Sequence, residues 1–389
     1  MPLPSALRRL AAAVLLLFAA AGQAAEPEKA LSGVLQAIEA NRLDLAMQRV
    51  EKLLEAHPNF RLGHLIRGDL LTARARPLET FGNVPKTVPR EKVEDLRAEA
   101  LLRLRAVRDR PSRERVPRYV LQLQAAQKYA LVVDSRRSRL YVFENVGGRP
   151  QFVADYYVSL GKNGVEKTRE GDQKTPIGVY HVTANLPRQK LSDFYGSGAF
   201  PINYPNAWDK RLGRNGHGIW LHGTPSSTYS RPPHASDGCI VLSNADLDAV
   251  GRTVQIGVTP VIITDEIDWI DAAALEADRK SLAGAQEAWR ADWASRDAGK
   301  YLAHYAPRFN SGDQDLAAWS EHKQKVNGTK SWIKVGVSNV SMLQYPRETF
   351  VVVNFDQDYR SSNLSNVMRK RQYWIKEDGR WRILYEGGA

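Results

Sequence analysis

Cysteine is almost absent from this sequence. Only Cys239 occurs among 389 residues, so neither an intrachain disulfide nor a metal cluster held by cysteines alone can form. A lone cysteine is either a small buried apolar side chain or a reactive group, and its surroundings decide between the two.

Long hydrophobic runs are also lacking. The longest, Leu10 to Ala21, follows two arginines and precedes small residues. About 12 apolar residues are too few to cross a bilayer, which takes roughly 20. The pattern predicts a secretory signal peptide over residues 1–24, with a buried or membrane-anchoring helix as the alternative. We therefore expect an exported, periplasmic protein without a membrane span.

Charge of one sign is in excess. Lysine and arginine number 55 against 43 acidic residues, which gives a net charge of +12. Such a surface favours anionic partners, including nucleic acid, anionic lipid and acidic cell-wall polymer, although a generic solvated basic surface is equally compatible. Nucleic acid is disfavoured by the expected export and by the lack of interleaved basic and aromatic residues.

The composition is that of a globular protein. Apolar residues make up 43% and charged residues 25%, which excludes collagen, coiled coil and wholly disordered chains. The length predicts two or three domains. We place a helical, tetratricopeptide-like region at residues 25–76 and a basic linker with one helix at 77–118. The helical region is too short for a repeat array and is expected to dock a protein partner.

The segment from Gly216 to Asp246 carries the chemistry. A short strand is expected to end at His222, and Gly238 allows a tight turn before Cys239 begins another strand. A neighbouring imidazole lowers the pKa of a thiol and stabilises the thiolate. Backbone amides after Gly238 could hold an oxyanion. Zinc binding is the alternative use of these side chains, namely His217, His222, His234 and Cys239.

These motifs resemble those of a known family. The run from His222 to Thr224, a loop of about a dozen residues, and Ser236-x-Gly238-Cys239 resemble the signature of the L,D-transpeptidase (YkuD) catalytic domain. Upstream, Gly161 to Gly164, Lys167 and Gly171 to Tyr180 resemble its glycine and Thr-Pro-x-Gly segments. The resemblance covers about 140 residues within a catalytic domain that we place at 119–268. It implies a mainly-β, sandwich-like fold that acts on peptidoglycan stem peptides.

The resemblance also assigns roles by position. It makes Cys239 the nucleophile, His222 the general base and Gly238 part of the oxyanion turn. Substrate contacts are assigned to the neighbouring residues Gly223, Thr224, Ser236 and Asp237. The family usually has histidine where this chain has Asp237. That carboxylate should either raise the pKa of the thiol by repulsion or orient an imidazolium. No metal or organic cofactor is expected, and Tyr204 and Trp208 are equally suited to a substrate groove and to a core.

A third domain is expected at residues 284–389. Five aromatic residues are predicted on helical segments, followed by four alternating strands; the aromatics are Trp289, Trp293, Tyr301, Tyr305 and Phe309. This order resembles the cone-shaped, α+β nuclear-transport-factor-two-like fold, which fits substrate or partner binding.

Taken together, the sequence predicts a multidomain periplasmic L,D-transpeptidase. Its catalytic domain would follow a short α-helical region and precede the α+β cone. It would crosslink peptidoglycan or attach groups to it through a Cys-His acyl-enzyme. Two alternatives remain open. One is a peptidase that sends water to the same acyl-enzyme, and the other is a catalytically silent wall-binding scaffold.

Overall fold

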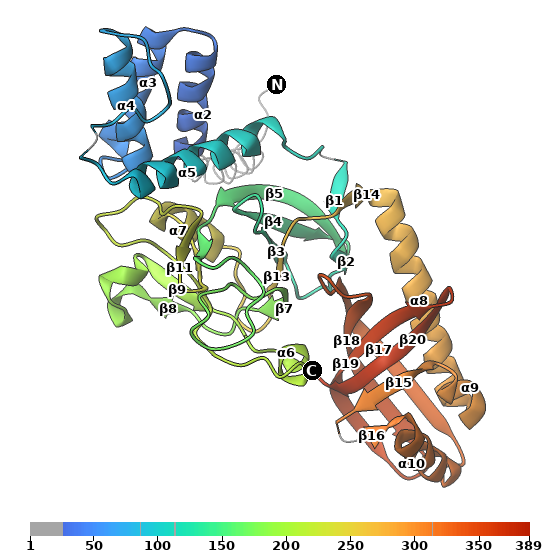
Figure 1. Cartoon of the computed structure of the whole chain (residues 1–389). Helices are drawn as coiled ribbons and strands as arrows, with labels where there is room; N and C mark the ends of the chain where they lie inside the picture. Colours follow the sequence, from blue (N-terminus) through green and yellow to red (C-terminus); the bar gives the residue numbers. More distant parts are fainter. Residues whose placement is uncertain (1–25, 86, 113, 313) are drawn as a thin grey trace, which may run out of the picture.

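The chain consists of three parts that follow one another along an elongated molecule (Figure 1). The computed structural model describes residues 26–85, 87–112, 114–312 and 314–389. The predicted signal peptide, residues 1–24, lies outside the described residues. In the part of the chain that the structure describes, no helix has both the length and the apolar character that a membrane crossing requires.

The first part is a group of helices, as predicted. These are α2 (Glu26–Glu39), α3 (Leu43–Ala56), α4 (Arg61–Ala73) and the basic helix α5 (Arg90–Arg108). Apolar residues three and four positions apart line one face of each of the first three helices, so those faces pack together. Their core is formed by Leu31, Val34, Met47, Val50, Leu53, Phe60, Leu62 and Ile66.

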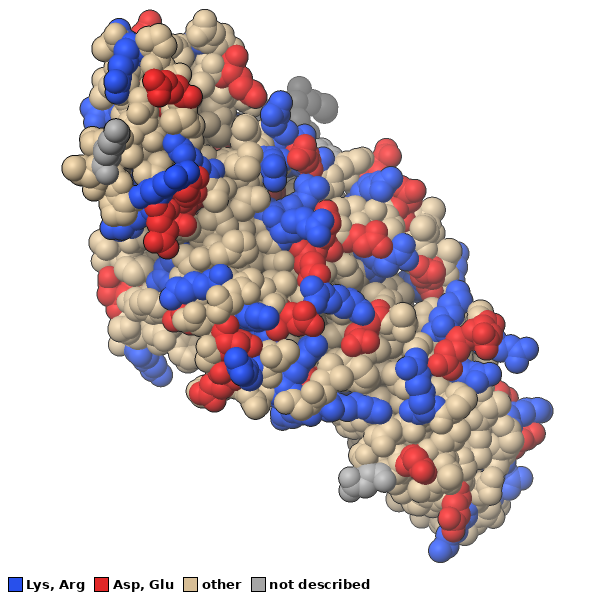
Figure 2. Space-filling view, in the orientation of Figure 1, with Lys and Arg blue, Asp and Glu red and all other residues tan. Residues whose placement is uncertain are grey.

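Arginines of the basic segment, residues 77–118, are paired with acidic residues. Arg103 is 4% exposed, and its guanidinium lies 2.7 Å from Glu28 and 2.8 Å from Glu99. Further pairs join Arg110 to Asp155, Arg115 to Asp271 and Arg118 to Asp268. Figure 2 shows basic and acidic side chains interspersed over the visible face. These arginines therefore form ion pairs that connect neighbouring elements, and they do not form a uniform basic surface.

The middle part is a β-sandwich. A five-stranded sheet has the order β5-β4-β3-β13-β7, and a four-stranded sheet has the order β12-β10-β9-β8. The core between them takes Leu131 and Val142 from one sheet and Phe200, Leu221 and Ile240 from the other. The mainly-β, sandwich-like expectation is thus confirmed.

The strand bounds of the sandwich follow the chain closely. The five-stranded sheet contains β3 (Tyr129–Asp134), β4 (Arg139–Val146), β5 (Arg149–Tyr157), β7 (Gly178–His181) and β13 (Pro260–Thr264). The other sheet contains β8 (Leu186–Pro187), β9 (Gly198–Pro201), β10 (Trp220–His222) and β12 (Ile240–Val241). Outside these sheets, β6 (Leu160–Gly161) pairs with β11 (His234–Ser236), and the helices are α6 (Ala207–Arg211) and α7 (Asn244–Gly251).

The C-terminal part is a curved sheet covered by helices. The helices are α8 (Ala272–Ser295), α9 (Ala298–Leu302) and α10 (Leu316–Gly328). The strands are β15 (Tyr305–Ser311), β16 (Gln314–Asp315), β17 (Ile333–Gln344), β18 (Phe350–Ser361), β19 (Ser365–Glu377) and β20 (Arg380–Gly388). The α+β cone is therefore present.

One sequence prediction within this part is wrong. Tyr305 and Phe309 were expected on a helix but lie in β15, which pairs in parallel with β20. A spacing of four places two side chains on the same face of a helix and also on the same face of a strand, so the pattern does not separate the two. Pairing with a strand far along the chain decided the outcome.

The middle and C-terminal parts share strands and a core. The short strand β2 (Val120–Gln122) lies before the sandwich in sequence but pairs with β17, so it extends the C-terminal sheet. The strand before it, β1 (Arg115–Pro117), pairs with β14 (Trp269–Asp271), which leads directly into α8. The sandwich is thus connected to the C-terminal domain by the segment before it in sequence, β1 and β2, and by the segment after it, β14.

Candidate active site

His222 ends β10, and Cys239 directly precedes β12, the neighbouring strand of the four-stranded sheet. β10 and β12 pair in parallel, with Leu221 opposite Ile240 and His222 opposite Val241. Leu221 and Ile240 point into the core. Because side chains alternate along a strand, His222 and Cys239 lie on the other face, two residues apart in register. The sheet therefore places on one face two residues that are 17 positions apart in the sequence.

The His222 ring is buried and its tautomer is set by the backbone. The side chain is 1% exposed, and its Nδ1 lies 2.7 Å from the Gly223 carbonyl oxygen. A carbonyl oxygen only accepts, so Nδ1 carries the proton and Nε2 keeps a lone pair. Burial, together with the positive charge of Arg231, lowers the pKa of His222 to about 4. At neutral pH the imidazole is therefore an uncharged base.

The Cys239 thiol is half-buried and protonated. Its Sγ donates to the Gly218 carbonyl oxygen at 3.4 Å. Burial raises the pKa of the thiol, and the backbone amide of Trp220 and the charge of Arg231 offset this only in part. The expected thiolate stabilised by the imidazole stays a prediction, and burial of both groups favours their uncharged forms before the attack.

A turn held by Ser236 places the cysteine. The Ser236 hydroxyl donates to the Cys239 carbonyl oxygen at 2.6 Å and accepts from the Gly238 amide at 3.1 Å. Gly238 has φ +120°, and a Cβ there would lie 2.6 Å from the Lys174 carbonyl oxygen. Glycine is thus required at this turn. Since the Gly238 amide is already bonded, the predicted oxyanion site depends on other donors and stays a prediction.

Gly223 and Thr224 are fastened to helix α7. The Asn244 side chain accepts from the Thr224 amide at 3.2 Å and donates to the Thr224 carbonyl oxygen at 2.9 Å. A Cβ on Gly223 would lie 2.1 Å from Asn244 Oδ1. Asn244 therefore holds the His-Gly turn, while Ser243 caps the helix. Substrate binding by Gly223, Thr224 and Ser236, all buried, stays a prediction.

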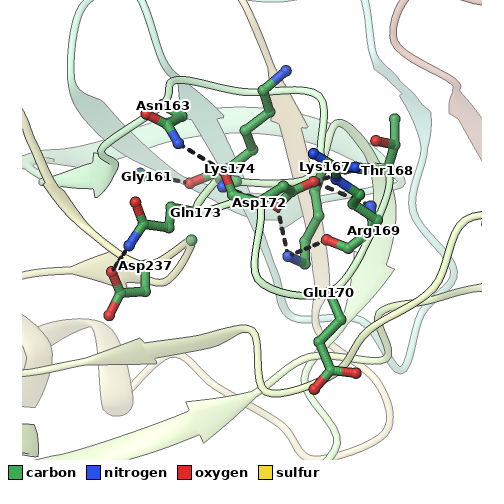
Figure 3. Close-up of polar contacts among 12 residues, drawn as sticks. Gly161, Asn163, Lys167, Thr168, Arg169, Glu170, Asp172, Gln173, Lys174 and Asp237 are labelled. Carbon is green, nitrogen blue, oxygen red and sulfur yellow. Dashed lines mark hydrogen bonds and ion pairs between the residues drawn. The ribbon is translucent and has the colours of Figure 1, made fainter.

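Asp237 is exposed and joined to the upstream loop. Its Oδ1 accepts from Lys162 Nζ and from Gln173 Nε2, each at 3.0 Å. Figure 3 shows the contact with Gln173. The carboxylate thus has a cationic partner in Lys162, and its repulsion of a thiolate is only one of the smaller effects on the pKa of Cys239.

The upstream glycine-rich segment is organised by one carboxylate. Asp172 accepts from Lys167 Nζ at 2.8 Å and from the amides of Thr168, Arg169 and Lys174 (Figure 3). Burial opposes ionisation, but these hydrogen bonds lower the pKa of Asp172 to about 2. Gly161 is required here because a Cβ would lie 2.4 Å from the Gln173 carbonyl oxygen. The motif residues thus shape a loop that contacts the Asp237 turn.

Three site residues escaped the sequence reasoning. Phe194 and Tyr195, on the 3-10 segment Asp193–Tyr195, lie with ring centroids 5.8 and 5.1 Å from that of His222. Arg231 lies on the loop between the two motifs, and its guanidinium carbon is 4.6 Å from the Phe194 ring centroid. Their places depend on folding of distant loops, and no local spacing marks them. The proximity of Arg231 to Cys239 in sequence was the one available signal.

The structure supports neither a substrate groove lined by Tyr204 and Trp208 nor the alternative zinc site. Tyr204 is 6% exposed within the sandwich core, and Trp208 packs on the C-terminal sheet, so neither lines a groove beside Cys239. Within residues 26–85, 87–112, 114–312 and 314–389, no three histidine, cysteine, aspartate or glutamate side chains are grouped as metal ligands. The alternative of a zinc site that uses His217 and His234 therefore has no geometric support.

Comparison with known families agrees with this architecture. Residues 128–263 match the L,D-transpeptidase catalytic domain (YkuD), and residues 281–387 match the Cds6 C-terminal NTF2-like domain. The Escherichia coli K12 protein described as "Putative L,D-transpeptidase YafK" is 26% identical over 159 residues, which is 38% of this chain. The chain spans 59% of the length of that curated relative.

Two solved structures match most of the length of this chain. The structure of Bd1075 from Bdellovibrio bacteriovorus is 29% identical, with a TM-score of 0.62, and covers 71% of this chain and 98% of its own. The helical cell shape determining protein Pgp2 from Campylobacter jejuni is 26% identical, with a TM-score of 0.60, and covers 70% of this chain and 95% of its own. The chain thus contains a YkuD-like catalytic domain followed by an NTF2-like domain.

Proposed function

We propose that this chain is an exported acyltransferase that acts on peptidoglycan stem peptides, with Cys239 as nucleophile and His222 as base. His222 Nε2 takes the proton of the thiol while Sγ attacks the carbonyl that links the diamino acid to D-alanine. The C–N bond then breaks, and the imidazolium gives its proton to the departing amine. D-Alanine leaves, and the stem peptide stays on sulfur as a thioester.

The second half of the reaction transfers the acyl group. An amine of another stem peptide, or of a protein or amino acid, attacks the thioester and gives its proton to His222. The new amide forms as the C–S bond breaks, and the proton returns to sulfur. With water in place of the amine, the same steps give a free acid and make the enzyme a peptidase.

The observation that carries the proposal is the pairing of β10 with β12, which sets His222 and Cys239 on one face of the sheet. The match of residues 128–263 to the L,D-transpeptidase catalytic domain supports the reaction type. The relative from Campylobacter jejuni is named for helical cell shape, which supports action on the wall. The apolar run at residues 10–21 supports periplasmic location.

The test is the mass of the products formed from a disaccharide tetrapeptide. Residues 26–389 are incubated with it, and the expected result is loss of D-alanine together with a crosslinked dimer. Tripeptide alone would instead favour the peptidase. Cys239→Ala is expected to abolish both products, because only the thiol forms the acyl-enzyme.

Two further measurements separate loss of chemistry from misfolding and from wall binding alone. The melting temperature of Cys239→Ala should stay close to that of the parent, because the side chain is small and half-buried. Wall binding without any wall chemistry in the parent protein would contradict the proposal and favour the silent scaffold.

A further inference from the structure

The Arg231 guanidinium lies over the Phe194 ring, which neighbours His222, and the charges of Cys239 and Asp237 act on it. Its carbon is 4.6 Å from the centroid of the Phe194 ring, which in turn lies 5.8 Å from that of His222. In the part of the chain that the structure describes, no carboxylate forms an ion pair with it. The other cations of this face differ, since Lys162 is paired with Asp237 at 3.0 Å and Lys167 with Asp172 at 2.8 Å.

The helical region holds the segment that carries this arginine. Ser230 Oγ donates to Glu99 of α5 at 2.7 Å, and Tyr157 donates its hydroxyl hydrogen to the Arg231 carbonyl oxygen at 3.0 Å. The ring of Tyr229 packs 4.6 Å from that of Phe60. Glu99 is itself 1% exposed and paired with the buried Arg103. The loop is thus fixed by α5 and the adjoining turn rather than free to swing.

We propose that Arg231 binds the terminal carboxylate of the peptide donor and so selects stem peptides that end in a free D-alanine. This rests on the proposed function. A guanidinium is the cation whose fork matches a carboxylate. In such a donor the carboxylate carbon is three bonds from the carbonyl carbon that Cys239 attacks, so the carboxylate comes close to a cation on the ring that neighbours His222. Where D-alanine continues into an amide, that charge is absent.

The same contact gives Arg231 a second effect in the reaction. While the substrate is bound, its carboxylate neutralises the guanidinium. D-Alanine keeps this carboxylate after the C–N bond breaks, so the guanidinium is unpaired only once D-alanine has left the site. Release of the product amino acid then separates two opposite charges. We therefore expect added free D-alanine, but not D-alaninamide, to compete with the donor.

The test compares two donors that differ only at the terminus, a tetrapeptide with a free acid and the same peptide as its C-terminal amide. The parent protein should cleave the acid with the larger kcat/KM. Arg231→Gln should lower kcat/KM for the acid by about 10- to 100-fold and leave the amide nearly unchanged, so that the preference disappears. Arg231→Lys should keep only part of the preference, because it retains charge without the fork.

Arg169→Gln is the matched control. Arg169 is exposed on the upstream loop, so the substitution removes the same charge without touching the Arg231 segment. Its acid-to-amide ratio should equal that of the parent. An Arg231→Gln protein that loses activity equally on both donors, or on neither, would overturn the proposal. Absence of cleavage of either donor by the parent would instead refute the proposed function.

Discussion

The pKa values of the base His222 and of the thiol Cys239 are moved apart at this site. Burial lowers the pKa of the His222 imidazole and raises that of the Cys239 thiol. Both shifts favour the uncharged forms, so the proton must move during the attack rather than before it. A resting ion pair would need a solvated or anion-paired imidazolium, whereas this ring faces Phe194 and Tyr195 and a carbonyl oxygen.

The pH dependence of the reaction follows from this state. Because the pKa of His222 is about 4, its base form persists well below neutrality. We expect kcat/KM to stay level from pH 7 down to about 5.5 and to fall as pH approaches 4. Steady-state rates in constant ionic strength buffers measure this. An acid limb centred near the ordinary histidine value of about 6.5 would contradict the buried neutral base.

Asp246 gives a prediction for stability. Burial raises its pKa to about 7, so between about pH 4 and 7 the folded state keeps a proton that the unfolded state loses. The free energy of unfolding therefore decreases as pH rises through this window, and the loss is complete above it. Asp246→Asn should stabilise the protein at pH 8 by up to about 4 kcal/mol and have little effect at pH 4.

Urea unfolding of both proteins at pH 4 and 8 measures the difference. Asp248→Asn, an exposed position on the same helix, is the control and should change neither value by more than about 0.5 kcal/mol. A loss of stability in Asp246→Asn that is the same at both pH values would show that the hydrogen bond with Ser243, at 2.8 Å, outweighs the burial of charge.

At the scale of elements, the site is a unit of two short strands and one helix. β10 delivers His222, β12 follows Cys239, and α7 begins three residues after β12 with Asn244 turned back onto the His-Gly turn. Strands of two and three residues have few hydrogen bonds of their own. Their mutual position therefore depends on the side-chain amide of Asn244 and on the core beneath Leu221 and Ile240.

Gly223→Ala tests this unit. The added methyl group would lie 2.1 Å from Asn244 Oδ1 and 3.0 Å from the Ser197 amide nitrogen, so α7 or the turn must move. We expect a loss of about 1–3 kcal/mol in the free energy of unfolding and a larger fractional loss of activity. Gly284→Ala, in helix α8 with open space around it, should be neutral or stabilising by about 0.5–1 kcal/mol. Equal effects at both positions would refute the argument.

At the scale of the whole molecule, the three parts are joined by buried contacts. Arg103 and Glu28 connect the helical region with Arg139 of the sandwich, and β2 joins the C-terminal sheet. On the other side, Trp208 of α6 packs 4.6 Å from Phe350 and donates its Nε1 hydrogen to Glu348 at 3.0 Å. We expect such contacts to make the middle and C-terminal parts unfold together.

Trp208→Ala measures the coupling between the sandwich and the C-terminal sheet. Removing the ring from its contacts with Phe350 and Tyr373 should cost about 2–4 kcal/mol and split the thermal transition into two. Differential scanning calorimetry detects the split. Trp332→Ala, at a tryptophan that is 44% exposed, should leave one transition near the original temperature. A single, unshifted transition in Trp208→Ala would contradict the coupling.

The sequence by itself predicted the helices of the first part, because apolar spacing is local, and its resemblance to two known families predicted the folds of the middle and C-terminal parts. Apolar spacing predicted most helices and strands and glycine predicted turns, while the roles of His222 and Cys239, taken from the His-Gly and Gly-Cys motifs, stay predictions. Only the tertiary structure decided the strand state of Tyr305 and Phe309, the burial that favours the uncharged forms of His222 and Cys239, and the contact of Arg231 with Phe194. Each of these features depends on burial or on a partner far along the chain, and a local sequence pattern predicts neither burial nor such a partner.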